Sequence, residues 1–281
     1  MSLVEPPHEA LAQAAELIDQ ADGLLVTAGA GMGVDSGMPD FRGTAGFWQS
    51  YPALGQARIA FERIANPQAF RVDAALAWGF YGHRLAMYRR TQPHAGFALL
   101  RQWAQAMPHG EAVFTSNVDG QFQQAGFDAM RVHECHGSIH HLQCARPCHE
   151  GIWPADAFVP EVDEATCRLL NAPPACPRCG GLARPNILMF GDGDWLAARS
   201  DPQADRLGQW LDRVRRPVVI ELGAGVHIPT VRHFSQHVVH ARGGRLIRIN
   251  PTDADVPTSR DVGLAMGALA GLRAIAARRG P

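Results

Sequence analysis

The sequence predicts an α/β protein: a Rossmann-like parallel sheet with helices on both faces, plus a small domain that combines helices with a metal-binding module. Three observations support this prediction. Apolar runs of four to six residues recur along the chain, and each ends in glycine or polar residues. The first run leads directly into a glycine-rich turn. Five of the six cysteines lie between residues 140 and 185.

Hydrophobic periodicity places the main elements. Four apolar residues at helical spacing predict a helix over residues 8–21. The alanine- and glycine-rich stretch 263–279 predicts a final helix. The apolar runs are too short for helices and predict buried strands at Gly23–Thr27, Ala112–Thr115, Pro217–Leu222 and Arg245–Ile249. Ligands of parallel sheets bind beyond the carboxyl ends of the strands, so the residues that follow these runs are candidate contacts.

Two further segments differ from the predicted strands in their composition and periodicity. Residues 44–92 are rich in aromatic side chains and are predicted to be helical, with Asn66 as an N-cap and Pro67 at the first helical position. Residues 140–185 are rich in proline and lack periodicity, which indicates a module held by metal rather than by an apolar core. We therefore expect a large domain of residues 1–43, 93–139 and 186–281 and a small domain of residues 44–92 and 140–185.

Composition excludes several function classes. The net charge of −1 argues against binding to nucleic acid or to an anionic membrane, and no apolar run is long enough to span a bilayer. The first ten residues lack the basic and apolar regions of a secretory signal. Cysteines concentrated in one part of a long chain favour metal binding over disulfides, so we expect a reducing, cytoplasmic location. Nothing in the sequence indicates an oligomeric state.

The cysteine spacing predicts a structural zinc site. Cys144 and Cys148 are followed, after 27 residues, by Cys176 and Cys179 in "CPRCG". Four thiolates complete a tetrahedral Zn²⁺ shell, and such a closed site is structural. Cys167 has no partner at ligand spacing and is expected to be a buried or loop thiol. The alternative is four reduced thiols without metal.

The glycine-rich turn carries the candidate cofactor site. Gly29, Gly31 and Gly33 can bring backbone amides close to a pyrophosphate, but Val34 stands where the common dinucleotide fingerprint has its third glycine. The turn alone fits a tight turn after a strand equally well. The longer string "GAGMGVDSGMPDFRG" (29–43) closely resembles the sirtuin signature G-A-G-x-S-x-x-S-G-I-P-D-F-R.

Other sirtuin-like motifs follow in the family's order. They are "TSNVDG" (115–120), "HGS" (136–138), the cysteine module, "RPNILMFGD" (184–192), "ELGAG" (221–225) and "RIN" (248–250). The resemblance covers residues 20 to 270. It implies an NAD-dependent protein-lysine deacylase that consumes NAD and transfers the acyl group of an acylated lysine to ADP-ribose. Acylated-lysine proteins are then the partners, and nicotinamide, free lysine and O-acyl-ADP-ribose the products.

The resemblance also implies roles for individual residues. His136 is the general base for the ribose hydroxyls, and Asn117 and Asp119 line the nicotinamide and ribose pocket. Without the resemblance, His136 would be taken as a structural histidine, and Asn117 and Asp119 as turn residues. The remaining NAD contacts implied are Ala30, Gly31, Asp40, Phe41, Arg42, Ser116, Gly223, Gly225, Asn250 and Ala265. Phe190 and Gly191 are implied to contact the acylated substrate.

Several positions depart from the family pattern. Gly33, Ser116 and Gly225 each lack a polar group that the family pattern has, and Asp192 stands in place of a glutamate. Each lost hydrogen bond costs about 0.5–1.5 kcal/mol. Two or three such losses would weaken NAD binding by about one to two orders of magnitude.

One further match concerns the acyl group. Tyr81 and Arg84 in "WGFYGHR" resemble the Tyr-x-x-Arg pair of sirtuins that remove succinyl and malonyl groups, since an arginine fork and a hydroxyl can hold a carboxylate. Two alternative functions also fit: a mono-ADP-ribosyltransferase or NAD hydrolase, and a module that senses NAD or ADP-ribose without turnover. Retention of Asn117, Asp119 and His136 argues against the sensing module.

Overall fold

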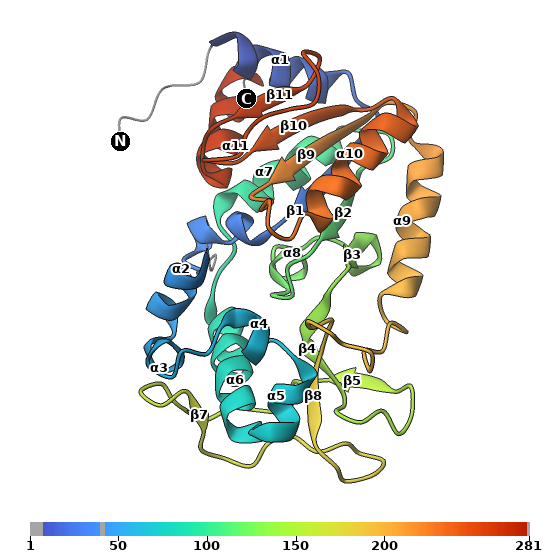
Figure 1. Ribbon diagram of the computed structural model, residues 1–281. Helices are drawn as coiled ribbons and strands as arrows, with labels where there is room; N and C mark the ends of the chain where they lie inside the picture. Colours follow the sequence, from blue (N-terminus) through green and yellow to red (C-terminus); the bar gives the residue numbers. More distant parts are fainter. Residues whose placement is uncertain (1–7, 40–42, 280–281) are drawn as a thin grey trace.

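The chain folds into two packed parts, and the larger part contains a six-stranded parallel sheet (Figure 1). The computed structural model describes residues 8–39 and 43–279. The strands, in spatial order, are β11 (Val262–Leu264), β10 (Arg245–Ile249), β9 (Pro217–Leu222), β1 (Gly23–Ala28), β2 (Glu111–Thr115) and β3 (Val132–Glu134). The predicted fold class is confirmed, as are the four predicted strands, to within one residue at each end.

Helices cover both faces of this sheet because its strands are apolar on both sides. Val218 and Ile220 point to one face, and Val219 and Leu246 to the other. The helices on the first face are α1 (His8–Asp19), α7 (Ala95–Gln105) and α11 (Ala268–Arg279). Those on the second face are α9 (Asp201–Arg213) and α10 (Thr230–Arg242).

Two short edge strands were not predicted, and one expected helix begins late. β3 and β11 contain three residues each. The predicted helix over 263–279 is wrong in its first part, because Val262–Leu264 pairs in parallel with β10. The helix itself starts at Ala268.

The smaller part is built from two insertions into the sheet, and Figure 1 shows them together below it. The first contains the helices α2 (Gly43–Ser50), α3 (Pro52–Gln56), α4 (Phe61–Ile64), α5 (Pro67–Val72) and α6 (Ala74–Arg90). The second contains an antiparallel sheet of β5 (Ile152–Pro154), β4 (Gly137–Cys144) and β8 (Ala183–Ile187) and a hairpin of β6 (Val162–Asp163) and β7 (Arg168–Leu169). Residues 44–92 are thus mostly helical, as predicted.

The two insertions share one apolar core. Trp78 and Tyr81 of α6 are buried in the same cluster as Ile139 and Leu142 of β4. The expectation that residues 140–185 are held by metal rather than by a core is therefore wrong in part. Asn66 caps α5 as predicted, since its side chain accepts a hydrogen bond from the Gln68 amide at 2.8 Å. The predicted domain boundaries stay a prediction.

Within residues 8–39 and 43–279, no helix combines the length and the apolar character needed to cross a bilayer.

Candidate functional site

The loop after β1 and the loop after β9 contact each other closely through glycine residues. The Gly31 amide donates to the Gly223 carbonyl at 3.1 Å. A Cβ on Gly31 would lie 2.7 Å from the Gly223 Cα, and one on Gly29 would lie 2.8 Å from the Gly223 oxygen. These glycines are therefore required for the contact between the two loops, in addition to any approach of a phosphate. Beside this contact, Ala30 is exposed and opens the 3-10 helix η1 (Ala30–Met32).

Substitution at this contact should be costly. Gly223 has φ +58°, and a Cβ there would lie 2.3 Å from the Gly31 carbonyl carbon. We expect Gly223→Ala to lower the free energy of unfolding by about 2–4 kcal/mol, from overpacking together with left-handed backbone strain. Gly225→Ala is the matched control, since a Cβ at Gly225 would meet nothing within 4 Å. Urea denaturation of both variants tests this, and equal stabilities would contradict it.

Asn117 joins the ends of β1 and β2. Its side-chain amide donates to the Gly29 carbonyl at 3.0 Å, and its backbone amide donates to the Thr115 hydroxyl at 3.0 Å. That hydroxyl donates in turn to the Ala28 carbonyl. The predicted site residues Ser116 and Asn117 are both partly exposed at this end of the sheet.

Asp119 is a buried carboxyl group. It accepts a hydrogen bond from the Gln121 amide at 2.9 Å, and its carbonyl contacts the His140 ring at 2.8 Å. Desolvation raises the pKa of Asp119 to about 6, and the nearby Glu134 carboxylate acts in the same direction. The positive charge of Arg84 on α6 opposes this shift. A residue of the smaller part therefore influences the pKa of a carboxyl group in the larger part.

Burial of Asp119 makes stability depend on pH. Its folded pKa lies above the usual value, so the folded state binds the proton more tightly, and stability falls as pH rises from about 4 to 6. We expect Asp119→Asn to raise the free energy of unfolding at pH 8 by about 1–3 kcal/mol. The difference should shrink towards zero at pH 4.

Asp128→Asn is the matched control for this prediction. Asp128 is exposed, and its carboxylate accepts from the Met130 amide at 2.9 Å just as Asp119 accepts from Gln121. Because Asp128 is exposed, its replacement relieves no desolvation, and we expect Asp128→Asn not to raise the free energy of unfolding at pH 8. Urea denaturation at pH 4 and pH 8 makes the comparison, and a pH-independent effect of Asp119→Asn would contradict the prediction.

His136 follows β3 and lies beside the end of β2. Burial lowers the pKa of its imidazole, so the ring is neutral at physiological pH. The nearby Ser116 backbone partly opposes that shift. A neutral imidazole carries a proton on one ring nitrogen and can accept one at the other. The Leu188 amide fixes the backbone here by donating to the His136 carbonyl at 3.0 Å.

Sequence reasoning missed the ion pair that holds this segment. Glu134, two residues before His136, is buried and contacts Arg199 at 2.5 Å. Its backbone amide donates to the Gln203 side chain at 3.1 Å, and its carbonyl accepts from the Ser200 hydroxyl at 2.9 Å. All three contacts fix the chain immediately before His136. The two charged residues are far apart in sequence, and no local pattern signals their pairing.

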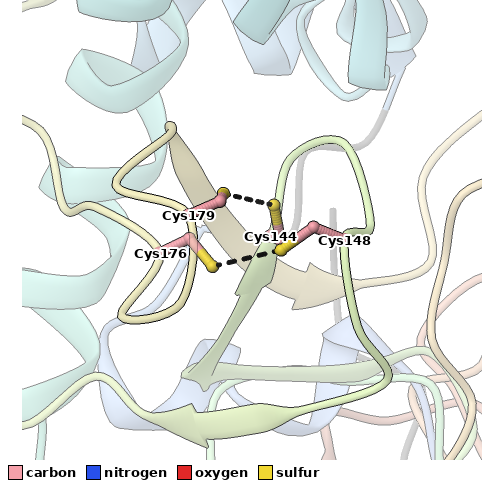
Figure 2. Close-up of side chains that lie close together, drawn as sticks. All are labelled: Cys144, Cys148, Cys176 and Cys179. Atoms are coloured by element: carbon pink, nitrogen blue, oxygen red, sulfur yellow. Dashed lines mark hydrogen bonds between the residues drawn. The ribbon is translucent and has the colours of Figure 1, made fainter.

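The four predicted zinc ligands lie together. Their Sγ atoms all lie within 4.8 Å of one another, with Cys144 and Cys179 at 3.8 Å and Cys148 and Cys176 at 3.7 Å (Figure 2). Four sulfurs about 2.3 Å from a tetrahedral Zn²⁺ are about 3.8 Å apart, whereas a disulfide requires about 2.05 Å. The cluster therefore has the dimensions of a zinc site. Cys167 is a buried thiol outside it, as predicted.

The residues predicted to contact the acyl group lie in the smaller part. Tyr81 is buried and its ring stacks on Phe70 at 5.5 Å. The Arg84 guanidinium donates to the Tyr88 hydroxyl at 2.7 and 3.0 Å. Phe190 is 36% exposed, and its backbone amide donates to the Ala65 carbonyl at 2.9 Å.

A cavity of about 400 Å³ adjoins the predicted substrate residue Gly191. It lies between the start of α5 and the loop after β8, with Arg71 and Asp194 forming an ion pair at 2.5 Å in its wall. Asp192, which departs from the family's glutamate, is not part of this wall. It forms a fully buried ion pair with Arg184 at 2.8 Å.

The predicted adenosine-side residues are at the ends of β10 and β11. The Asn250 side chain is buried and already engaged with protein, because it donates to the Ala224 carbonyl at 2.9 Å and accepts from the Thr252 and Asp253 amides. Ala265 is exposed. The predicted contacts Asp40, Phe41 and Arg42 lie outside the described residues.

A family model, named relatives and a solved structure all place this chain among Sir2-like proteins. The Sir2 family model matches residues 29–201. A protein of Thermococcus kodakarensis named NAD-dependent protein deacylase is 30% identical over 254 residues, covering 90% of this chain and 89% of the relative. One of the same name from Aquifex aeolicus is 27% identical, covering 90% and 93%. A solved complex of a Sir2 homologue with NAD superimposes with a TM-score of 0.71 at 26% identity, covering 95% of this chain and 93% of that one.

Proposed function

The chain belongs to the Sir2 family, and we propose from this premise that it is an NAD-dependent protein-lysine deacylase. The observation that supports this most is the meeting of three segments at the carboxyl ends of neighbouring strands. The glycine loop follows β1, Asn117 and Asp119 follow β2, and His136 follows β3. In an open parallel sheet, this edge is where ligands bind.

NAD is consumed as a substrate and supplies the ADP-ribose that accepts the acyl group. Gly29 and Gly31 have no side chains, so the backbone of the loop after β1 can approach the pyrophosphate closely. His136, which burial keeps neutral, accepts a proton from a ribose hydroxyl at its unprotonated ring nitrogen. Asn117 lies at the same end of the sheet, where its side-chain amide is bonded to the Gly29 carbonyl.

Zinc has a structural place in this proposal. Cys144, Cys148, Cys176 and Cys179 would hold Zn²⁺ as a closed four-thiolate site, which leaves no open position for substrate. β4 runs from Gly137, directly after His136, to the first of these cysteines. The metal module thus anchors the far end of the strand that follows the catalytic histidine.

A product assay tests the proposed function. The protein is incubated with NAD and an acetylated, succinylated or unmodified lysine peptide, and the products are identified by mass spectrometry. O-acyl-ADP-ribose, formed only with acylated peptide, is the expected result. Free ADP-ribose, or a protein mass gain of one ADP-ribose unit, formed regardless of peptide would contradict deacylation.

We also propose that Arg84 favours acyl chains ending in a carboxylate. Arg84 lies three residues along α6 from Tyr81, is partly exposed, and donates through its guanidinium to the Tyr88 hydroxyl. An arginine fork can bind a carboxylate bidentately. We therefore expect Arg84→Gln to reduce kcat/KM for a succinyl-lysine peptide at least about tenfold relative to kcat/KM for an acetyl-lysine peptide. Arg90→Gln, an exposed arginine on the same helix, is the control. Equal losses on both peptides would contradict the preference.

A further inference from the structure

We propose that the protein has a second anion site, a basic cavity at the amino ends of β2 and β3. The cavity has a volume of about 220 Å³ and lies between α9, the start of β2 and the 3-10 helix η3 (Ala129–Arg131). Its lining residues are Ala112, Asp128, Met130, Arg131, Arg206, Leu207, Gln209, Trp210 and Arg213. Asn117 and His136 follow the opposite ends of the same two strands, so this cavity is separate from the proposed catalytic cleft.

The floor of the cavity is rigid and apolar. Ala112, Leu207 and Trp210 are all buried. The Trp210 indole nitrogen donates to the His109 carbonyl at 2.9 Å, which fixes the ring against the edge of the sheet. A bound group would therefore rest on side chains that are already held in place.

The rim carries an excess of positive charge that other side chains do not neutralise. Arg131 donates to the His109 and Glu111 carbonyls at 2.9 and 3.1 Å, and Arg206 donates through Nε to the Met130 carbonyl at 3.1 Å. Carbonyls orient a guanidinium without cancelling its charge. Neither these two arginines nor Arg213 forms an ion pair with any residue in the described part of the chain.

The cavity contains one carboxylate. Asp128 accepts a hydrogen bond from the Met130 amide, so it serves as a cap for η3. The lining thus offers three guanidinium groups against one carboxylate, and backbone carbonyls orient those of Arg131 and Arg206. Such an arrangement suits a small anion with several oxygens, such as a phosphate or pyrophosphate group. The volume is below the roughly 300–1,000 Å³ of pockets for drug-sized ligands, so it favours a small anionic group over a whole dinucleotide.

Calorimetric titration with pyrophosphate tests this site. NAD is kept at saturating concentration so that the catalytic cleft is occupied. We expect one saturable event with a Kd below about 1 mM that weakens as ionic strength rises. The double variant Arg206→Gln/Arg213→Gln should weaken binding at least about tenfold, since it removes two charge-assisted contacts.

Two further variants separate this result from a folding defect. Arg215→Gln removes an exposed arginine outside the lining and should leave the affinity unchanged. Asp128→Asn keeps the capping oxygen but removes the single carboxylate, so it should tighten binding, which partial unfolding would not do. Absence of saturable binding, or wild-type affinity in the double variant, would overturn the proposal.

Discussion

Replacing His136 with alanine should lower the rate of acyl transfer to ADP-ribose by about 10²–10⁴-fold, the usual contribution of a positioned general base. The imidazole is held neutral by burial, so one of its ring nitrogens can accept a proton. Alanine removes that acceptor without adding a charge. The measurement is the kcat for O-acyl-ADP-ribose formation at saturating NAD and peptide.

The His136 variant needs a control for folding. The backbone contact from Leu188 to the His136 carbonyl does not depend on the side chain, so the loop should keep its place. Unchanged zinc content and thermal unfolding would establish this. His237→Ala, which removes an exposed histidine on α10, should retain wild-type kcat. If His136→Ala kept more than about a tenth of the activity, the base would have to be another group.

The central strands could be predicted from the sequence because their signal is local. "PVVIEL" and "RLIRI" are apolar on both faces, and they form β9 and β10 with the predicted bounds. The edge strands could not be predicted in this way. "VHE" and "VGL" are too short to show a period, and they are strands because β2 and β10 offer them a partner.

In the site, too, only features with a local sequence signal could be predicted. Asn117 and His136 are predicted as site residues because each lies in a motif of the family pattern, and their roles stay a prediction. The Glu134–Arg199 ion pair and the contact between Gly31 and Gly223 join segments far apart in sequence. Such pairs depend on which strands become neighbours, and strand order is not encoded in any one local stretch. Glycines that a motif assigns to a ligand can therefore serve loop packing as well.

The sequence stretch from His136 to Cys148 shows how one strand serves two sites. Its three histidines and two cysteines could have formed a single mixed metal site. β4 instead separates them: His136 lies just before its first residue, and Cys144 is its last. The His140 ring contacts the Asp119 carbonyl, and no histidine of this stretch is part of the cluster of four sulfurs. His149, which follows the stretch, lies beside that cluster, with its Nε2 3.4 Å from the Cys176 sulfur.

Loss of one zinc ligand should remove the metal and lower the thermal stability of the protein. We expect Cys176→Ser to abolish stoichiometric zinc binding, because a serine hydroxyl is a poor substitute for a thiolate in a four-sulfur site. The wild-type protein should contain about one zinc per chain by elemental analysis. Metal binding at structural sites contributes directly to folding, so the variant should also unfold at a markedly lower temperature.

The pairing of β4 with β8 explains why loss of zinc should also affect the proposed catalytic site. Cys176 and Cys179 lie just before β8, and Cys144 ends β4, so the metal fastens together two strands that pair with each other. The same pair begins at Gly137 and Ile187, beside His136. Cys167→Ser is the control, because this buried thiol is outside the cluster and its replacement should leave the zinc in place. A wild-type protein that is folded and free of zinc would contradict the structural role of the metal, as would full zinc occupancy in Cys176→Ser.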